Sequence, residues 1–162
     1  MDHNQAAALE LPMLLEPDPS CPLSRKDLWV ERDLFSALRS LIKESETLGG
    51  ITIHFFHDSV PPDLPTTRRL AILCIAREAL SNIVRYARTK RVLFSLCRRG
   101  KMIELSIEDN GIGFDVERRK RRGAPSNGLQ IMELRAAEVG GMLSIQSFVK
   151  GGTRVIAKLP LF

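Results

Sequence analysis

The chain of 162 residues has no hydrophobic run long enough to cross a membrane, since its longest uninterrupted apolar stretch is Leu70 to Ala76. Its first ten residues, MDHNQAAALE, contain no basic segment followed by an apolar one, so we expect no secretion signal. Cysteine is scarce, and the three residues include no Cys-x-x-Cys pair, which favours a reducing cytosol over a disulfide framework or a zinc site. The sequence therefore predicts a cytoplasmic protein without membrane contact.

Outside one basic segment, the chain also lacks an excess of charge of either sign. The formal net charge is +5, from 24 Lys and Arg against 19 Asp and Glu. The run RRKRR at 118–122 supplies five of these positive charges, so the rest of the chain sums to zero. We interpret the run as a local, solvated loop rather than a stripe that follows a duplex, and we expect no nucleic-acid partner.

What the chain does contain is enough hydrophobic residues, 44%, to fill the core of one domain. Residues 1–26 carry several prolines and no sustained periodicity, which predicts a flexible tail or linker with a short helical piece near Ala6 to Leu11. In the remaining domain, 27–162, the apolar spacing predicts helices over 27–48, 66–88 and 129–139 and strands over 51–56, 91–98, 101–108, 142–149 and 153–159. This order indicates an α+β fold, a two-layer α/β sandwich in which a mixed, mostly antiparallel sheet of about five strands is covered on one face by about three helices.

One stripe of polar residues lies at the edge of the apolar face of the helix predicted over 70–87. Glu78, Asn82 and Arg85 fall at i, i+4 and i+7. A carboxylate one turn from an amide can polarise a water while the amide oxygen ligates Mg²⁺. Taken alone, the stripe is more typical of an ordinary amphipathic helix whose charged residues face solvent.

The segment DNGIGFD at 109–115 follows a predicted strand, where Asp-Asn-Gly is most often only a turn. The glycines Gly111 and Gly113 around Asp109 would leave room for a flat ligand to approach the backbone. Asp109 could then accept a hydrogen bond from an exocyclic amine, a charge-assisted contact worth about 1.5–3 kcal/mol.

Two further segments carry weaker signals. Residues 118–127 combine five cations with almost no apolar side chains, which is typical of a mobile lid, and Gly128 and Leu129 then begin a helix whose N-terminus can bind phosphate. Gly151-Gly152-Thr153 places a hydroxyl at the start of the last strand, where Thr153 could support Asp109 directly or through water. The alternative for this last segment is a plain β-turn.

The order of these segments resembles the ATP-binding domain of the Bergerat-fold ATPases, the superfamily of gyrase, heat-shock chaperones, mismatch-repair ATPases and histidine kinases. The likeness is strongest to sensor histidine kinases of the nitrate-sensor class and covers roughly residues 34–160. AREALSNIVRYARTKRV (76–92) resembles the N box, DNGIGFD the G1 box, NGLQIMELRAAEVGGMLSIQS (127–147) the G2 segment and GGTRVIAKLP (151–160) the closing strand.

The resemblance implies ATP and Mg²⁺ as cofactors and assigns roles to the residues named above. Glu78 would orient or activate the attacking group, and Asn82 would ligate the Mg²⁺ that bridges the phosphates. Asp109 would receive the adenine amino group. The rest of the implied ATP site consists of Arg85, Gly111, Gly113, Gly128, Leu129 and Thr153, with the lid cations as further phosphate contacts.

The chain departs from the family pattern at two positions and offers no evident phospho-acceptor. Ser126 stands where many relatives have glycine, and Tyr86 stands where this class often has histidine. His3, His54 and His57 do not lie in the helical His-acidic-Arg context of a dimerisation helix. The implied partners are therefore a histidine on a separate dimerisation domain and, beyond it, a response regulator.

The sequence thus predicts the ATP-binding catalytic domain of a sensor histidine kinase, an enzyme that transfers the γ-phosphoryl group of ATP to histidine. Two alternatives stay open. One is a stand-alone serine kinase of the anti-sigma type, and the other is a degenerate domain that binds nucleotide or a partner without phosphoryl transfer. Retention of the Glu78 and Asn82 pair argues against the second alternative.

Overall fold

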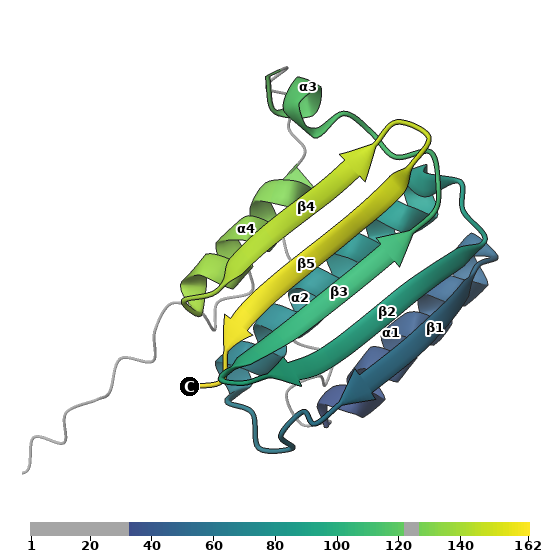
Figure 1. Ribbon diagram of the computed structural model, residues 1–162. Coiled ribbons are helices and arrows are strands. Elements are labelled where there is room, and N and C mark those ends of the chain that lie inside the picture. The colour runs from purple at the N-terminus through teal and green to yellow at the C-terminus, as the bar shows by residue number, and fades with distance from the viewer. Residues whose placement is uncertain (1–32, 122–126) are drawn as a thin grey trace, which may run out of the picture.

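The protein is described here from a computed structural model, and the description covers residues 33–121 and 127–162 (Figure 1). The predicted tail at 1–26, His3 and Ser126 lie outside these residues. Along the chain the elements are α1 (Leu34–Gly49), β1 (Thr52–Asp58), α2 (Thr66–Asn82), the π-helical segment η2 (Ile83–Ala87), β2 (Arg91–Arg99), β3 (Met102–Asp109), α3 (Val116–Arg121), α4 (Asn127–Glu138), β4 (Met142–Phe148) and β5 (Gly152–Pro160).

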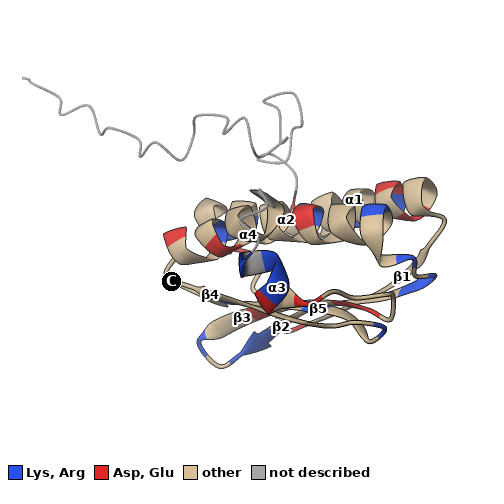
Figure 2. Ribbon diagram, turned by 90° about the horizontal axis from the view of Figure 1, so that it is seen from above, with Lys and Arg blue, Asp and Glu red and all other residues tan. Residues whose placement is uncertain are grey.

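The five strands form one sheet in the order β1-β2-β3-β5-β4. β1 pairs with β2 in parallel, and the other neighbouring strands pair antiparallel. The helices α1, α2 and α4 form a single layer on one face of this sheet (Figures 1 and 2). The predicted α+β sandwich with a mixed, mostly antiparallel sheet is therefore confirmed.

The alternation predicted for the third strand separates the two faces of the sheet. Ile103, Leu105 and Ile107 of β3 are fully buried beneath the helices. On the opposite face, Glu108 lies 3.6 Å from the Arg154 guanidinium of β5, and a similar pair joins Glu104 to Lys158 at 3.8 Å. One face of the sheet therefore carries the core, and the other carries exposed ion pairs.

The described part of the first predicted helix has a defined start, and residues 27–32 of that prediction lie outside the described residues. It begins at Leu34 because Asp33 acts as its N-cap, accepting hydrogen bonds from the backbone N–H groups of Phe35 (3.0 Å) and Ser36 (3.1 Å). The predicted stop is confirmed, since Gly50 has a left-handed conformation with φ of 56°.

The central helix of the layer, α2, packs between α1 and α4 (Figure 2), which explains why it is buried on more than one side. Its buried residues are Ala71, Ile72, Leu73, Cys74, Ile75, Ala76, Ala79 and Leu80. The helix predicted to end at Arg88 is continuous to Ala87, but its last turn is the π-helix η2. Arg88 then ends it with a left-handed φ of 53°.

The basic run predicted as a loop is partly helical. Asp115 begins α3 by accepting hydrogen bonds from the backbone of the first turn, from Arg118 N–H to its carboxylate (2.9 Å) and from Arg119 N–H to its carbonyl (3.1 Å). The described residues therefore contain one α-helix more than the sequence predicts, and the remainder of the expected lid, 122–126, lies outside them.

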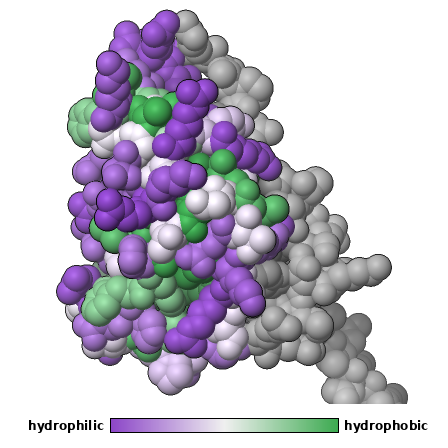
Figure 3. All heavy atoms as spheres, turned by 90° about the vertical axis from the view of Figure 1, so that its right-hand side faces the viewer, coloured by the Kyte–Doolittle hydropathy of each residue, from purple (hydrophilic) through white to green (hydrophobic). Residues whose placement is uncertain are grey.

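The side of the molecule formed by α1 and β1 has a mixed surface, with hydrophobic residues between hydrophilic ones (Figure 3). Leu48 and Phe56 are two exposed hydrophobic residues of these elements. In the part of the chain that the structure describes, no helix is both long enough and apolar enough to cross a membrane.

Candidate nucleotide-binding site

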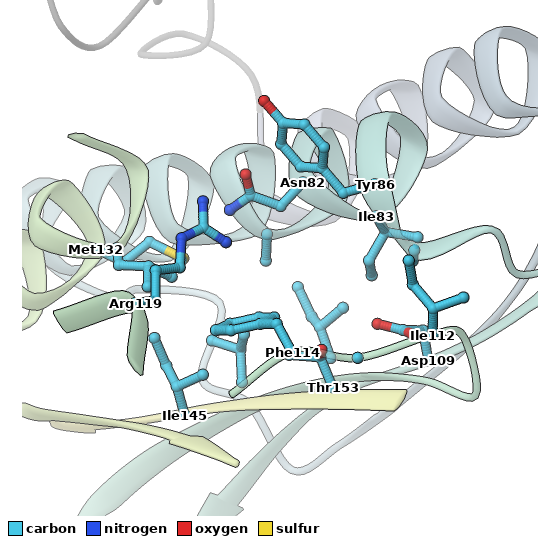
Figure 4. Close-up of a pocket in the computed structure, with 16 residues that line it drawn as sticks. Asn82, Ile83, Tyr86, Asp109, Ile112, Phe114, Arg119, Met132, Ile145 and Thr153 are labelled. Atoms are coloured by element: carbon cyan, nitrogen blue, oxygen red, sulfur yellow. The ribbon is translucent and has the colours of Figure 1, made fainter. Parts of the chain in front are cut away.

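A cavity of about 250 Å³ lies between the helix layer and the sheet (Figure 4). Its walls come from the end of α2 and η2, the loop after β3, the helices α3 and α4, and the helix-facing side of β3, β5 and β4. The lining residues are Ala79, Asn82, Ile83, Tyr86, Ala87, Ile107, Asp109, Ile112, Gly113, Phe114, Arg119, Leu129, Met132, Ile145, Thr153 and Val155.

Asp109, the last residue of β3, supplies a buried carboxylate at the sheet side of this cavity and is 5% exposed. Burial raises the pKa of Asp109 above its ordinary value, because the charged form loses water. Hydrogen bonds from the backbone N–H groups of Gly111 and Thr153 oppose this shift, and the Gly111 bond is 2.7 Å long. The side chain is thus held as an acceptor in a desolvated position.

The loop after β3 needs glycine at positions 111 and 113 for a different reason from the one predicted. A Cβ at Gly111 would lie 2.0 Å from the Ala87 carbonyl oxygen, and a Cβ at Gly113 would lie 2.0 Å from the Phe148 carbonyl oxygen. The expectation that they leave room for a ligand is therefore wrong in its cause, because protein backbone occupies these spaces. Gly113 still lines the cavity, and it also has a positive φ of 57°.

Close packing of this loop is completed by two backbone hydrogen bonds. Ile112 N–H donates to the Ala87 carbonyl at 2.8 Å, and Lys150 N–H donates to the Ile112 carbonyl at 2.7 Å. The loop is thereby attached to the end of η2 on one side and to the turn between β4 and β5 on the other.

Thr153 lies beside Asp109 in the paired strands β3 and β5, as the sequence predicts, but its two polar groups have separate partners. Its backbone N–H bonds to the Asp109 side chain, whereas its hydroxyl lies 2.8 Å from the hydroxyl of Ser147. Ser147 was not singled out from the sequence. The available signal was a serine at a helix-facing position of β4, in alternation with the partly buried Leu143 and Ile145.

On the helix side, the predicted acid and amide have different surroundings. Asn82 lines the cavity, whereas Glu78, one turn earlier, lies against the first turn of α4. A Cβ at Gly128 would lie 2.1 Å from a carboxylate oxygen of Glu78, so glycine permits this contact. A carboxylate at a helix N-terminus is favoured by the backbone N–H groups and the helix dipole.

The predicted cations are divided between the cavity and the surface. Arg85 is exposed and does not line the cavity. Arg119 of the basic run does, with its guanidinium 5.0 Å from the centre of the Phe114 ring. Figure 4 shows Arg119 extending from α3 toward Asn82, while Asp109 and Thr153 lie at the sheet side.

Most of the apolar lining was not predicted. Leu129 was expected at the site and lines it, but Ile112, Met132 and Ile145 were not singled out. Apolar side chains are combined here with a few polar groups, as is usual for sites that bind small molecules.

Comparison with known proteins identifies the family. Residues 68–162 match the family model described as histidine kinase-, DNA gyrase B-, and HSP90-like ATPase. Sensor protein VraS of Staphylococcus saprophyticus is 38% identical over 140 residues, which is 86% of this chain. Sensor histidine kinase LiaS of Bacillus subtilis is 36% identical over 88 residues, which is 54% of this chain. The chain spans only 38% and 24% of the length of these two relatives.

Solved structures agree in fold. A blue-light activated histidine kinase of Erythrobacter litoralis EL346 superimposes with a TM-score of 0.63 at 21% identity, covering 80% of this chain and 42% of that one. The histidine kinase AdeS of Acinetobacter baumannii gives a TM-score of 0.65 at 16% identity, covering 80% and 65%. Because the family model matches more than half of the sequence and includes both walls of the cavity, the chain belongs to the family of histidine kinase-, DNA gyrase B- and HSP90-like ATPases.

Proposed function

We propose that this chain is the cytoplasmic, ATP-binding catalytic domain of a sensor histidine kinase. The observation that carries the proposal is the cavity that joins Asn82 of α2 to Asp109 of β3, residues 27 positions apart in the sequence. Asn82 offers an oxygen ligand for a metal ion, and Asp109 offers a desolvated hydrogen-bond acceptor for a base. Both groups are therefore available to one ligand. Relatives named as sensor kinases favour this function over a serine kinase of the anti-sigma type.

In this proposal the base of ATP enters at Asp109. The carboxylate accepts a hydrogen bond from the adenine amino group, and Thr153 contributes a second polar group beside it. The apolar side chains of Ile83, Ile112 and Met132 contact the faces and edges of the base. Burial strengthens the hydrogen bond to Asp109 because water competes poorly there.

The phosphates are proposed to extend toward Asn82 and the start of α4. The first turn of α4, with Gly128 and Leu129, offers backbone N–H groups to them. Arg119 adds a positive charge from α3, and Arg85 adds another if the phosphates reach the surface of the helix. Glu78, which lies at Gly128, is then next to the transferred group and orients or activates its acceptor.

Mg²⁺ fits this site as an ion bound mainly by ATP and water, with one ligand from the protein. Among the described residues there is no group of three or more His, Cys, Asp or Glu that could hold a metal ion by itself. Mg²⁺ prefers oxygen ligands and keeps waters and phosphates around it, so the amide oxygen of Asn82 suffices as the protein ligand when ATP supplies the others. The ion would neutralise phosphate charge during transfer.

The proposed acceptor is a histidine on a separate dimerisation domain, from which a response regulator takes the phosphoryl group. His54 and His57 of this chain lie on β1, at the far side of the sheet order from β4, and neither lines the cavity. Catalysis would depend mainly on positioning and charge neutralisation, as in phosphoryl transfer generally.

Equilibrium binding of ATP, measured with and without Mg²⁺, tests the proposal. Asn82→Ala should remove the Mg²⁺ dependence of binding, and Asp109→Asn should weaken ATP at least tenfold in either condition. Gln146→Ala and Asp58→Asn make the same chemical changes at exposed positions outside the cavity and should leave binding unchanged. Wild-type affinity in both site variants would exclude this cavity as the nucleotide site.

Transfer is tested separately by supplying a histidine-bearing dimerisation domain in trans with labelled ATP. Acid-labile label on that domain, abolished by Asn82→Ala, supports a histidine kinase. Label on an anti-sigma antagonist instead would establish the serine-kinase alternative, while binding without transfer to either would leave a nucleotide-binding domain without kinase activity.

A further inference from the structure

The strand β1 lies at one edge of the sheet and has little of the protection that edge strands usually carry. Within the part of the chain that the structure describes, β1 pairs only with β2, so its other edge faces outward. Its sequence, TIHFFHD at 52–58, contains neither proline nor lysine, which commonly keep edge strands from pairing with another chain. Phe56 is 61% exposed on this side of the molecule (Figure 3). Such an edge can accept a further strand.

The direction of the backbone groups decides which residues of β1 face the open edge. Thr52 N–H donates to the Lys90 carbonyl at 2.9 Å, on the side of β2. The N–H and C=O groups of one residue point to the same edge of a strand, and those of the next residue point to the opposite edge. The backbone groups of Ile53, Phe55 and His57 therefore point outward.

Glu46 of α1 already occupies the first of these outward groups. Ile53 N–H donates to the Glu46 carboxylate at 2.8 Å, so another strand could use this donor only by breaking that bond. At the other end of β1, Ser59 has a left-handed φ of 55° and turns the chain away from the extended conformation. Phe55 and His57 are therefore left as the residues whose outward groups another strand can pair with.

These limits select one register for the pairing of two copies of β1. Residues directly opposite each other in an antiparallel pair lie on the same face of the sheet. If Phe55 lies opposite His57 of a second copy, and His57 opposite its Phe55, the Ile53 N–H is not needed and Phe56 lies on the twofold axis. A centre nearer to the start of β1 would use the Ile53 N–H, and a centre nearer to its end would extend past the end of the strand.

The side chains are complementary in this register. His54 lies opposite Asp58 of the second copy, twice by symmetry, and an imidazole can donate a hydrogen bond to a carboxylate. Phe55 lies opposite His57, the same kind of ring contact that these two residues make within one chain, with ring centres 5.5 Å apart. Phe56 meets Phe56 of the second copy, which removes both exposed rings from water.

We propose that β1 is a dimerisation edge, which pairs antiparallel with β1 of a second copy around Phe56 and joins the two sheets into one. This self-complementarity favours a second copy over an unrelated extended peptide, because one strand supplies both members of each pair. The inference does not depend on the proposed function, since β1 and β4 lie at opposite edges of the sheet and no residue of β1 lines the cavity.

Sedimentation equilibrium of the full chain, between about 1 µM and 1 mM protein, tests the proposal. The wild-type protein should show a concentration-dependent equilibrium between monomer and dimer. Phe56→Lys brings two like charges together on the twofold axis and should raise the dissociation constant about tenfold or more. Phe148→Lys makes the same change at a residue that is 72% exposed on β4, the other edge strand, and should leave the constant unchanged. Circular dichroism checks that both variants are folded.

An exchange of the two polar residues tests the register. His54→Asp places two carboxylates opposite each other and should weaken the dimer by about fivefold or more. Adding Asp58→His restores the pair in the reverse sense and should restore the wild-type dissociation constant. A register centred on Phe55 would place His54 opposite Phe56 instead, so the second substitution would then bring no recovery.

Wild-type protein that remains monomeric over the whole range would overturn the proposal, as would a dimer that Phe56→Lys leaves intact or that Phe148→Lys weakens equally. Failure of Asp58→His to rescue His54→Asp would overturn the register and the proposal with it. ATP binding should be the same in Phe56→Lys as in wild type, so loss of the dimer and loss of the nucleotide site are separate results.

Discussion

The two ends of the cavity are built in different ways. At the end near Asp109, polar groups are held by strands and short backbone contacts, including the Gly111 N–H bond to the carboxylate and the Thr153 hydroxyl at Ser147. At the end near Asn82, the polar groups are side chains from helices, with Arg119 extending from α3 toward Asn82 of α2. The comparison indicates that the proposed base end is preorganised and that the proposed phosphate end is assembled from helix ends, which can adjust to a ligand.

The largest expected effect comes from disturbing the preorganised end at Gly113. Gly113→Ala introduces a Cβ 2.0 Å from a backbone carbonyl oxygen at a residue with a φ of 57°. We expect a loss of about 3 kcal/mol or more in the free energy of unfolding, measured by denaturant titration.

Gly100 offers a matched control for this substitution. Its φ of 64° is nearly the same, but a Cβ there would meet nothing within 4 Å. Gly100→Ala should therefore cost only the backbone term, about 1 kcal/mol. Equal losses in the two variants would contradict the close approach of the loop to Phe148.

The next effect concerns the protonation of Asp109. Burial raises its pKa above the ordinary 3.8, so the carboxyl takes up a proton at milder acidity than an exposed aspartate. Protonation removes the charged acceptor, and ATP affinity should fall by about tenfold as the pH decreases through this raised pKa. Binding isotherms between about pH 4 and pH 8 measure the effect. Asp109→Asn should show only the part of the pH dependence that belongs to ATP itself.

The stability of the empty protein should change with pH in the opposite sense at this residue. A carboxyl whose pKa is higher in the folded than in the unfolded state binds more protons when folded, so it favours folding at low pH and loses this contribution as the pH rises through the folded value. The difference in free energy of unfolding between wild type and Asp109→Asn should therefore become less favourable to wild type as the pH rises above 3.8. A pH-independent difference would mean that the carboxyl is not desolvated.

The smallest effect is expected at the assembled end. Arg119→Ala removes one partly exposed cation near the proposed phosphates and should weaken ATP by about twofold to fivefold, less at high salt. Arg99→Ala removes an exposed cation at the C-terminal end of β2, outside the cavity, and should have no effect on binding. A loss as large as that of Asp109→Asn would show that the two ends contribute alike.

Much of the fold could be predicted because its periodicities are strong. The alternation around Ile103, Leu105 and Ile107 fixed the strand and its buried face, and Gly49-Gly50 marked the end of a helix. The short helix α3 was missed because its six residues are mostly charged, and its start depends on a single Asp115 cap. The π-helical turn after Asn82 was missed because a change of hydrogen-bond register leaves no pattern in side-chain spacing.

At the site, the polar residues were easier to predict than their surroundings. Asn82, Asp109 and Thr153 stand in motifs, and the structure brings all three to one cavity. Ile112 and Met132 could not be separated by sequence from ordinary core residues, because apolar side chains form the same pattern in both settings. The sequence also could not show why residue 111 must be glycine, because the backbone that it approaches, at Ala87, belongs to a helix 24 positions earlier.

The π-helical turn η2 affects how long a ligand can be if it is to contact both Asn82 and Asp109. Its last carbonyl, on Ala87, holds the Ile112 N–H, so the end of the helix that carries Asn82 is tied to the loop that starts at Asp109. Removing one residue from η2 would restore an ordinary helical turn and rotate Ala87 away from Ile112. The main chain thus fixes the distance between Asn82 and Asp109, the two proposed contact points for the nucleotide, before a ligand binds.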